Sequence, residues 1–195
     1  MFFKYIKNRM GNQLGTLKKE EVELLQNSSH FDSRELRTLY KQFRKDSPSG
    51  TINKQEFKEI MTQMGVGDQF LQDLLFNVFD KNKDSTINFQ EFVCGLSSIT
   101  RGTPEEKIEF AFSLYDIDGN GYITKSEMES ILESMYKLVG TFVTCSGKKF
   151  DSHDLIEEFF DSMDDDGDGF ISLEEYKRGT LKNPDIIQGL KLLNH

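Results

Sequence analysis

Hydrophobic residues recur along this chain in short stripes that have the spacing of one helix face. Within each stripe the apolar positions follow the pattern i, i+3, i+4, i+7, which predicts an amphipathic helix. A polar segment of twelve residues lies next to each stripe, so we expect helix–loop–helix units. The stripes comprise Leu36, Leu39, Tyr40 and Phe43; Phe57, Ile60, Met61 and Met64; Leu71, Leu74, Leu75 and Val78; Ile108, Ala111, Phe112 and Tyr115; and Met128, Ile131, Leu132 and Met135.

Two helix starts are marked by capping residues. Asp32 precedes the first stripe and is followed three residues later by Glu35, which is a capping box with Asp in place of Ser or Thr. Thr103 and Glu106 repeat this arrangement later in the chain. The intervening segment Ser98–Gly102 is interpreted as a linker between two lobes.

The polar segments form a repeat of four. Their starts lie 35, 36 and 48 residues apart, and a period in this range indicates one supersecondary unit used several times. The segments are KDSPSGTINKQE (Lys45–Glu56), DKNKDSTINFQE (Asp80–Glu91), DIDGNGYITKSE (Asp116–Glu127) and DDDGDGFISLEE (Asp164–Glu175).

Consecutive units are expected to pair, which gives an all-α fold of two lobes with short β-pairing between loops. Residues 28–100 would form the N-terminal lobe and residues 101–182 the C-terminal lobe. Residues 1–27 would be an N-terminal extension, and residues 183–195 a tail containing a further helix.

The chain carries 33 acidic and 24 basic side chains, for a net charge of −9. This balance argues against nucleic acid as a partner and suits a protein that binds cations. Two cysteines do not make a disulfide framework, no apolar run is long enough for a transmembrane helix, and the N-terminus lacks the apolar core of a signal peptide. We therefore expect a cytoplasmic protein.

The spacing of oxygen-bearing residues in the repeat predicts calcium sites. Calcium takes six to eight oxygens, which a twelve-residue loop supplies from positions 1, 3 and 5, a carbonyl at 7 and a bidentate Glu at 12, with Gly at 6 for the turn. The third and fourth loops match this pattern fully, and position 8 is Ile in all four loops. The predicted ligands are Asp116, Asp118, Asn120, the Tyr122 carbonyl and Glu127 in the third loop, and Asp164, Asp166, Asp168, the Phe170 carbonyl and Glu175 in the fourth.

The second loop has a complete ligand set but lacks the turn glycine. Ser85 stands there, and a residue other than glycine at positive φ costs about 1 kcal/mol. We expect a working but weaker site. Its predicted ligands are Asp80, Asn82, Asp84, the Thr86 carbonyl and Glu91.

The first loop keeps the frame of a metal site without its ligands. Lys45 occupies position 1, and an ammonium among the ligands repels the ion. Gly50, Ile52 and Glu56 remain in register. We interpret this loop as structural, because the second loop needs a partner strand at Ile52. Three calcium ions are therefore expected.

On these residues the chain resembles the neuronal calcium sensor family, which includes frequenin, recoverin, visinin-like proteins and hippocalcin. The resemblance runs from about Gly11 to Leu190 and rests on the altered PSG first loop (Pro48–Gly50), the RGT hinge (Arg101–Thr103), and the stretch Ala111–Thr124. It implies four EF-hands in two lobes and a sensor of calcium that acts on kinases, cyclases, channels or receptors.

The start of the chain departs from the family. MGNQLGT (Met10–Thr16) resembles the family's myristoylation start, but Gly11 is internal here, and Gly15 stands where Ser or Thr is wanted. If Met10 is the start, Gly11 is the lipidation site and the protein is reversibly peripheral at membranes. Alternatively, the basic and aromatic residues before Met10 form a weak interfacial anchor, or they are an artefact.

The resemblance also implies a groove in the N-terminal lobe that binds an amphipathic helix of a target protein. The matching positions are Leu39, Tyr40, Phe43, Phe57, Ile60, Met61, Met64, Phe92 and Leu96. Each could instead be ordinary core.

Several alternative functions stay open. A calcineurin-B-like regulatory subunit of a phosphatase or kinase normally keeps a competent first loop, and Lys45 speaks against it. A calcium-triggered photoprotein needs Trp, and this chain has none. A passive calcium buffer would open little on binding. No catalytic constellation is present in the sequence, so we expect no enzyme.

Overall fold

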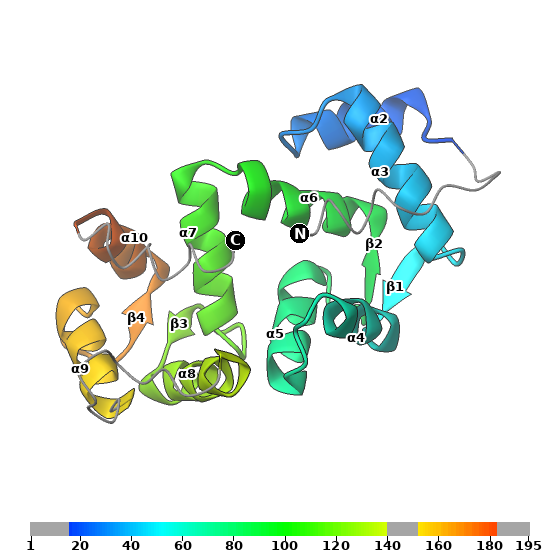
Figure 1. Ribbon diagram of the computed structural model, residues 1–195. Coiled ribbons are helices and arrows are strands. Elements are labelled where there is room, and N and C mark those ends of the chain that lie inside the picture. Colours follow the sequence, from blue (N-terminus) through cyan, green and yellow to red (C-terminus); the bar gives the residue numbers. More distant parts are fainter. Residues whose placement is uncertain (1–15, 140–151, 183–195) are drawn as a thin grey trace. The chain divides into compact units, whose positions relative to one another are not determined.

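The computed structural model describes residues 16–139 and 152–182 (Figure 1). Within these ranges the loops connect helices and four short strands, and this predominance of helix confirms the all-α prediction. The chain divides into two compact units. Among the described residues, the first contains residues 16–65 and 75–107, and the second contains residues 66–74, 108–139 and 152–182.

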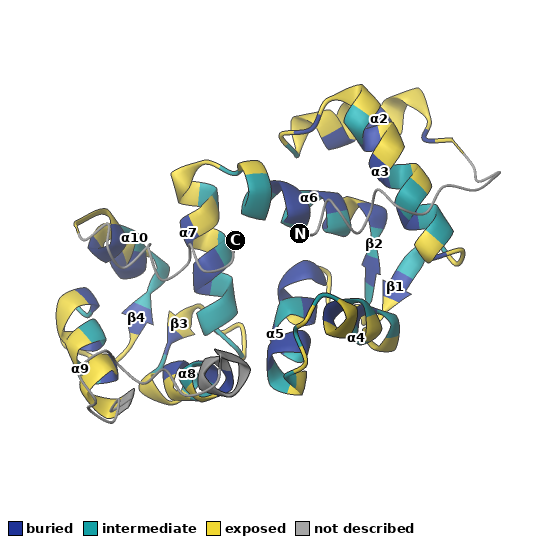
Figure 2. Ribbon diagram, viewed as in Figure 1, coloured by how far each residue is buried: buried dark blue, intermediate teal, exposed yellow. Residues whose placement is uncertain are grey.

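The first unit holds the first two loops and their helices. Strands β1 and β2 pair antiparallel with Ile52 opposite Ile87, and both isoleucines are buried (Figure 2). The predicted pairing between the first and second loops is therefore present. Its elements are α2 (Lys19–Asn27), α3 (Ser33–Asp46), β1 (Thr51–Asn53), α4 (Lys54–Gln63), the end of α5 (Gln69–Phe79), β2 (Thr86–Asn88), α6 (Phe89–Arg101) and the first turn of α7 (Pro104–Tyr115).

Helix starts in this unit follow the sequence closely. The capping box predicted at Asp32 is confirmed, because its carboxylate accepts from Arg34 N and Glu35 N, both at 2.8 Å, while Glu35 accepts from Asp32 N at 3.0 Å. The box at Thr103 is also confirmed, with Thr103 N donating to Glu106 Oε2 at 2.7 Å. These caps satisfy backbone donors that a helix start leaves unpaired.

The predicted linker Ser98–Gly102 is wrong for most of its length, since α6 continues to Arg101. The hydroxyls that suggested a linker bond back to the helix, Ser98 to the Cys94 carbonyl at 3.1 Å and Thr100 to the Leu96 carbonyl at 2.7 Å. Such i−4 bonds let Ser and Thr remain helical. Gly102 ends the helix.

The start of the first unit also differs from the expected extension over residues 1–27. Residues 19–27 form α2, which buries Val22 and Leu25, and Leu17 just before it is buried as well. Helix α2 packs on α3 and α6. Val22 and Leu25 are too few to make the i, i+3, i+4, i+7 pattern, so hydrophobic spacing alone does not predict this helix.

The second unit holds the third and fourth loops. Strands β3 (Tyr122–Ile123) and β4 (Ile171–Ser172) pair antiparallel with Ile123 opposite Ile171. The remaining elements are most of α7, α8 (Lys125–Val139), α9 (Ser152–Met163) and α10 (Leu173–Lys182). Its core is built from Ile108, Ala111, Phe112, Ile123, Met128, Ile156, Phe160, Met163, Ile171 and Tyr176.

Residues 66–74 also belong to the second unit, although they precede the second loop. Leu71 and Leu74 at the start of α5 form a buried cluster with Ile131 of α8. Residues 66–74 therefore group with the second unit, and the predicted lobe bounds of 28–100 and 101–182 stay a prediction. No helix in the described residues is long and apolar enough to cross a membrane.

Candidate calcium sites

The third loop brings three carboxylates together. Oxygen atoms of Asp116, Asp118 and Glu127 all lie within 4.8 Å of one another. Oxygens that bind one calcium ion at 2.3–2.6 Å are separated by at most about 5 Å, so these groups fit a single ion. Asp116 also braces the turn by accepting from Asn120 N and Gly121 N, both at 2.9 Å.

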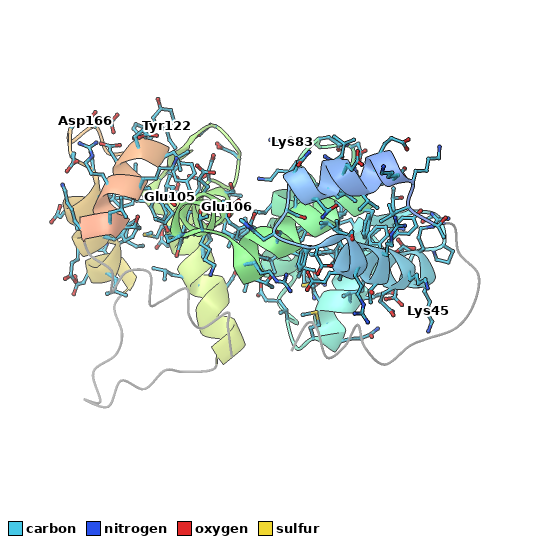
Figure 3. All side chains as sticks on the ribbon, turned by 90° about the horizontal axis from the view of Figure 1, so that it is seen from above. Lys45, Lys83, Glu105, Glu106, Tyr122 and Asp166 are labelled. Carbon is cyan, nitrogen blue, oxygen red and sulfur yellow. The ribbon has the colours of Figure 1, made fainter. Side chains whose placement is uncertain are left out.

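The fourth loop converges in the same way through a different set of acids. Asp164, Asp166 and Asp168 have carboxylate oxygens within 4.8 Å of one another. Asp164 accepts from Gly169 N at 2.9 Å across the turn. Figure 3 shows Asp166 at the outer edge of this loop, so an ion can reach the carboxylates from solvent.

The glutamate at position 12 bridges each of the last three loops. One of its oxygens accepts from the backbone near the loop start, and the other accepts from the residue that caps the following helix. Glu91 bonds Asn82 N and Asn88 N. Glu127 bonds Ile117 N and Thr124 N, and Glu175 bonds Asp165 N and Ser172 N, at 2.8 to 3.2 Å.

The second loop keeps this bridge but holds its turn with residues that are not glycine. Lys83 has φ 57° and Ser85 has φ 68°, and both conformations disfavour a side chain. Asp84 accepts from Thr86 N and from the Thr86 hydroxyl at 2.8 Å, and from the Asn82 amide at 2.9 Å. A bound ion would have to share these oxygens.

The set of carboxylates that meet differs between the loops. Positions 1, 3 and 12 lie within 4.8 Å of one another in the third loop, and positions 1, 3 and 5 do so in the fourth. The second loop has Asn82 at position 3, so it offers neither set of three carboxylates, although its predicted ligands are all present.

The first loop is held together without acidic ligands. Gly50 N donates to the Ser47 carbonyl at 3.0 Å, and Ser47 is buried. The Arg44 guanidinium lies against Gly50, whose φ of 97° requires glycine. Glu56 accepts only from Asn53 N, at 2.9 Å, among its neighbours in the described residues, so it caps α4 and does not bridge the loop.

The protonation of the ligands responds to their surroundings. Burial raises the pKa of Asp116, which means that its negative charge is short of compensation in the protein alone. The Ser172 hydroxyl lowers the pKa of Glu175, and the Thr86 hydroxyl lowers that of Asp84. A cation bound among these groups would favour the ionised form of each.

At position 7 the side chains of the third and fourth loops point outward. Tyr122 is 47% exposed and Phe170 is 45% exposed, and their rings meet edge to face with centroids 6.1 Å apart. In the second loop Thr86 is half-buried, and its hydroxyl donates to Asp84 Oδ1 at 2.8 Å. The use of the three carbonyls as calcium ligands stays a prediction.

The residues expected to line the target groove lie in the first unit, partly in its core. Leu39, Phe43, Phe57, Met61 and Leu96 are buried, while Tyr40, Ile60, Met64 and Phe92 are half-buried. The groove remains a prediction, since it would require the buried members to become accessible.

An aromatic cluster joins α3 to α6 beside these positions. Phe89 contacts Tyr40 and Phe43 with ring centroids 4.9 and 5.3 Å apart, and Phe92 lies 5.3 Å from Phe43. Phe89 lies between the strand of the second loop and Glu91, outside the hydrophobic stripes, so the hydrophobic pattern does not predict its place in this cluster. Its contacts with Tyr40 and Phe43 depend on how α3 packs against α6, which residue spacing does not report.

Two expectations fall outside the described residues. Gly11, the predicted lipidation position, precedes residue 16, and the tail helix predicted within residues 183–195 follows residue 182.

Comparison with known proteins agrees with this geometry. The EF-hand domain pair matches residues 105–181, and the USP32 N-terminal domain matches residues 26–120. The curated "Calcium-binding protein NCSA" of Dictyostelium discoideum is 98% identical over 185 residues, which cover 95% of this chain and 100% of that protein.

Proposed function

This chain belongs to the neuronal calcium sensor family of EF-hand proteins, and from that premise we propose that it binds three calcium ions and thereby controls a target protein. It is a calcium-binding protein.

The observation that carries the count is the bridging glutamate. Glu91, Glu127 and Glu175 each span from the loop start to the following helix, whereas Glu56 only caps α4. A bidentate glutamate closes an EF-hand site, so three loops are prepared for closure and one is not.

Calcium binding would change the distance between the helices that flank each loop. The first ligand follows the entering helix, and the glutamate lies in the first turn of the leaving helix, so one ion acts on both helix ends. In sensor EF-hands this opens the helix pair and exposes an apolar groove. The pairing of Ile52 with Ile87 would carry the movement from the second loop to α3 and α4.

The exposed surface would bind an amphipathic helix of a target such as a kinase, cyclase, channel or receptor. Opening would uncover Phe43, Phe57 and Met61 next to half-buried Tyr40 and Met64. Two methionines give such a surface the adaptability typical of helix-binding grooves. The protein would act by binding and not by catalysis, in the cytoplasm and at membrane surfaces.

The experiment compares two glutamate variants. Glu91→Gln should weaken the calcium-dependent brightening of a hydrophobic dye even with the third and fourth sites filled. Glu56→Gln makes the same chemical change in the first loop and should leave the response intact. Equal dye signals with and without calcium would instead favour a passive buffer or a constitutive regulatory subunit.

A further inference from the structure

The third loop contains the one asparagine in the chain that is followed by glycine. Asn120 is position 5 of this loop and Gly121 is position 6. The other asparagines precede residues that carry a side chain, for example Lys83 after Asn82. Asparagine is one of the chemically less stable residues in proteins. It reacts most readily before glycine, because no side chain on the next residue hinders attack of that residue's backbone nitrogen on the asparagine amide.

The peptide that joins these two residues is open to solvent. Asn120 and Gly121 are both exposed, so water reaches the side-chain amide. A carbon added at Gly121 would meet no atom within 4 Å, and the φ of 91° at this residue is one that glycine adopts without penalty. The reacting groups can therefore approach each other without displacing a neighbouring side chain.

Hydrogen bonds hold the Asn120 amide beside this peptide. The Tyr122 backbone N donates to Asn120 Oδ1 at 2.8 Å, which folds the amide back along the loop in a turn typical of asparagine. Asn120 Nδ2 donates to Asp118 Oδ2 at 3.0 Å. The Gly121 nitrogen itself donates to Asp116 Oδ2 at 2.9 Å. Attack by this nitrogen moves negative charge onto Oδ1, where the Tyr122 N–H is already placed to stabilise it.

We propose that Asn120 is a site of spontaneous deamidation and that calcium bound in the third loop suppresses the reaction. The Gly121 nitrogen forms a bond to Cγ of Asn120, and the bond from Cγ to Nδ2 breaks. The proton of the Gly121 N–H passes through solvent to the leaving nitrogen, which departs as ammonia. Water then opens the cyclic imide at either of its two carbonyls and gives aspartate or isoaspartate. Water is the co-reactant, and no group is oxidised or reduced.

The effect of calcium rests on the proposed binding of an ion by the third loop. Position 5 of such a loop supplies its side-chain oxygen to the ion, so calcium would hold Oδ1 of Asn120 in the ligand position. Closing the cyclic imide brings Cγ to the Gly121 nitrogen and turns Oδ1 away from that position. The reaction then requires the ion to dissociate first, and its rate should follow the fraction of protein with an empty third loop.

The two products change the third loop differently. Aspartate at position 5 is what the fourth loop already has in Asp168, which also precedes a glycine, so this product keeps a complete ligand set. Isoaspartate adds a carbon to the main chain between positions 5 and 6. This carbon shifts the Tyr122 carbonyl relative to Asp116, so the isoaspartate product should lose the third site. A chain kept without calcium would therefore lose one calcium site with time.

The test incubates the full chain at neutral pH, either with a chelator or with free calcium about ten times above the Kd of the third site. Peptide mass spectrometry measures the mass gained at Asn120 when its amide becomes an acid. The gain should be about tenfold faster with chelator, since about a tenth of the third loops are empty in the calcium sample. Native mass spectrometry in restored calcium should then find one ion fewer on the isoaspartate product than on fresh protein.

Three variants sharpen the test. Asn120→Gln lengthens the side chain by one carbon and should abolish the mass gain at this position. Glu127→Gln removes the ion from the third loop, so in calcium it should react as fast as the unmodified protein does in chelator. Lys83→Gly places glycine after Asn82, at a residue with φ 57°, and should create a second site of mass gain in the second loop.

The results that would contradict the proposal differ from one another. No mass gain at Asn120 in chelator would overturn the modification site, whatever the number of ions bound. Equal rates in calcium and chelator, on a protein shown to hold three ions, would overturn the protection by calcium. Equal rates on a fresh protein that holds no ion in the third loop would instead overturn the proposed function, because Glu127→Gln would then leave the ion count unchanged.

Discussion

The two pairs of loops use one frame in different ways. In the second unit both loops turn on glycines and bring three carboxylates within 4.8 Å. In the first unit one loop has lost its ligands, and the other keeps them on a turn without glycine. The residues at positive φ are Gly119, Gly121, Gly167 and Gly169 in the second unit, against Lys83 and Ser85 in the second loop.

This difference shows that two loops can pair through their strands even where one of them lacks the ligands for an ion. The first loop binds its neighbour through Ile52 and Ile87 just as the third loop binds the fourth through Ile123 and Ile171. Pairing therefore survives the loss of a metal site. Because its turn lacks glycine, we expect the second loop to bind calcium more weakly than the two loops of the second unit.

The largest expected effect is the loss of a site in the second unit. Glu127→Gln or Glu175→Gln removes one of the two oxygens that close the loop, so each variant should bind one ion fewer by calorimetry. A variant that retained the full count at unchanged affinity would contradict the assigned register of ligands.

The next effect concerns the pairing of the first two loops. Ile87 is fully buried, and Ile87→Ala should lower the free energy of unfolding by about 2–5 kcal/mol. Affinity at the second site should fall as well, because its partner strand is disturbed. Urea unfolding and calcium titration check both, with the milder Ile87→Val as the control.

A smaller effect tests the strain in the second loop. Ser85→Gly should raise the free energy of unfolding by about 1 kcal/mol, because glycine accepts positive φ without penalty. The reverse change, Gly121→Ser, should cost a similar amount, since no atom lies within 4 Å of the added carbon and only the backbone conformation is affected. If Ser85→Gly were destabilising, the positive φ would not be the source of the weakness.

The smallest effect is a pH dependence in the first unit. Arg101, followed by the Asp32 backbone, lowers the pKa of Glu35 below its ordinary value of 4.5. Glu35 therefore contributes stability above pH 4.5, and this contribution is lost as the pH falls through its folded pKa. Glu35→Gln should flatten the acid end of the stability profile, whereas exposed Glu20→Gln should not.

Much of the candidate site could be predicted because its geometry is local. Ligand spacing within twelve residues fixes which groups can meet, and the caps at Asp32 and Thr103 depend on neighbours three residues away. Lys45 alone predicts that the first loop binds no ion. The caps are confirmed because they depend on local chemistry, so the sequence was sufficient for them.

The missing parts depend on contacts between distant residues. Helix α2 is stabilised by packing on α3 and α6, and Leu71 and Leu74 join Ile131 in the second unit. Arg101 is held in α6 while its guanidinium pairs with Glu35 and stacks on Phe31. Residue spacing does not predict contacts between residues so far apart in the sequence, so the linker predicted at Ser98–Gly102 was wrong for most of its length.

We expect one loop in the first unit and two loops in the second to bind calcium. Native mass spectrometry of the full chain counts the ions directly. The protein should hold three, Glu91→Gln should hold two, and Glu56→Gln should still hold three. Four ions, or a loss on Glu56→Gln, would show that the first loop binds calcium despite Lys45 and would contradict the account.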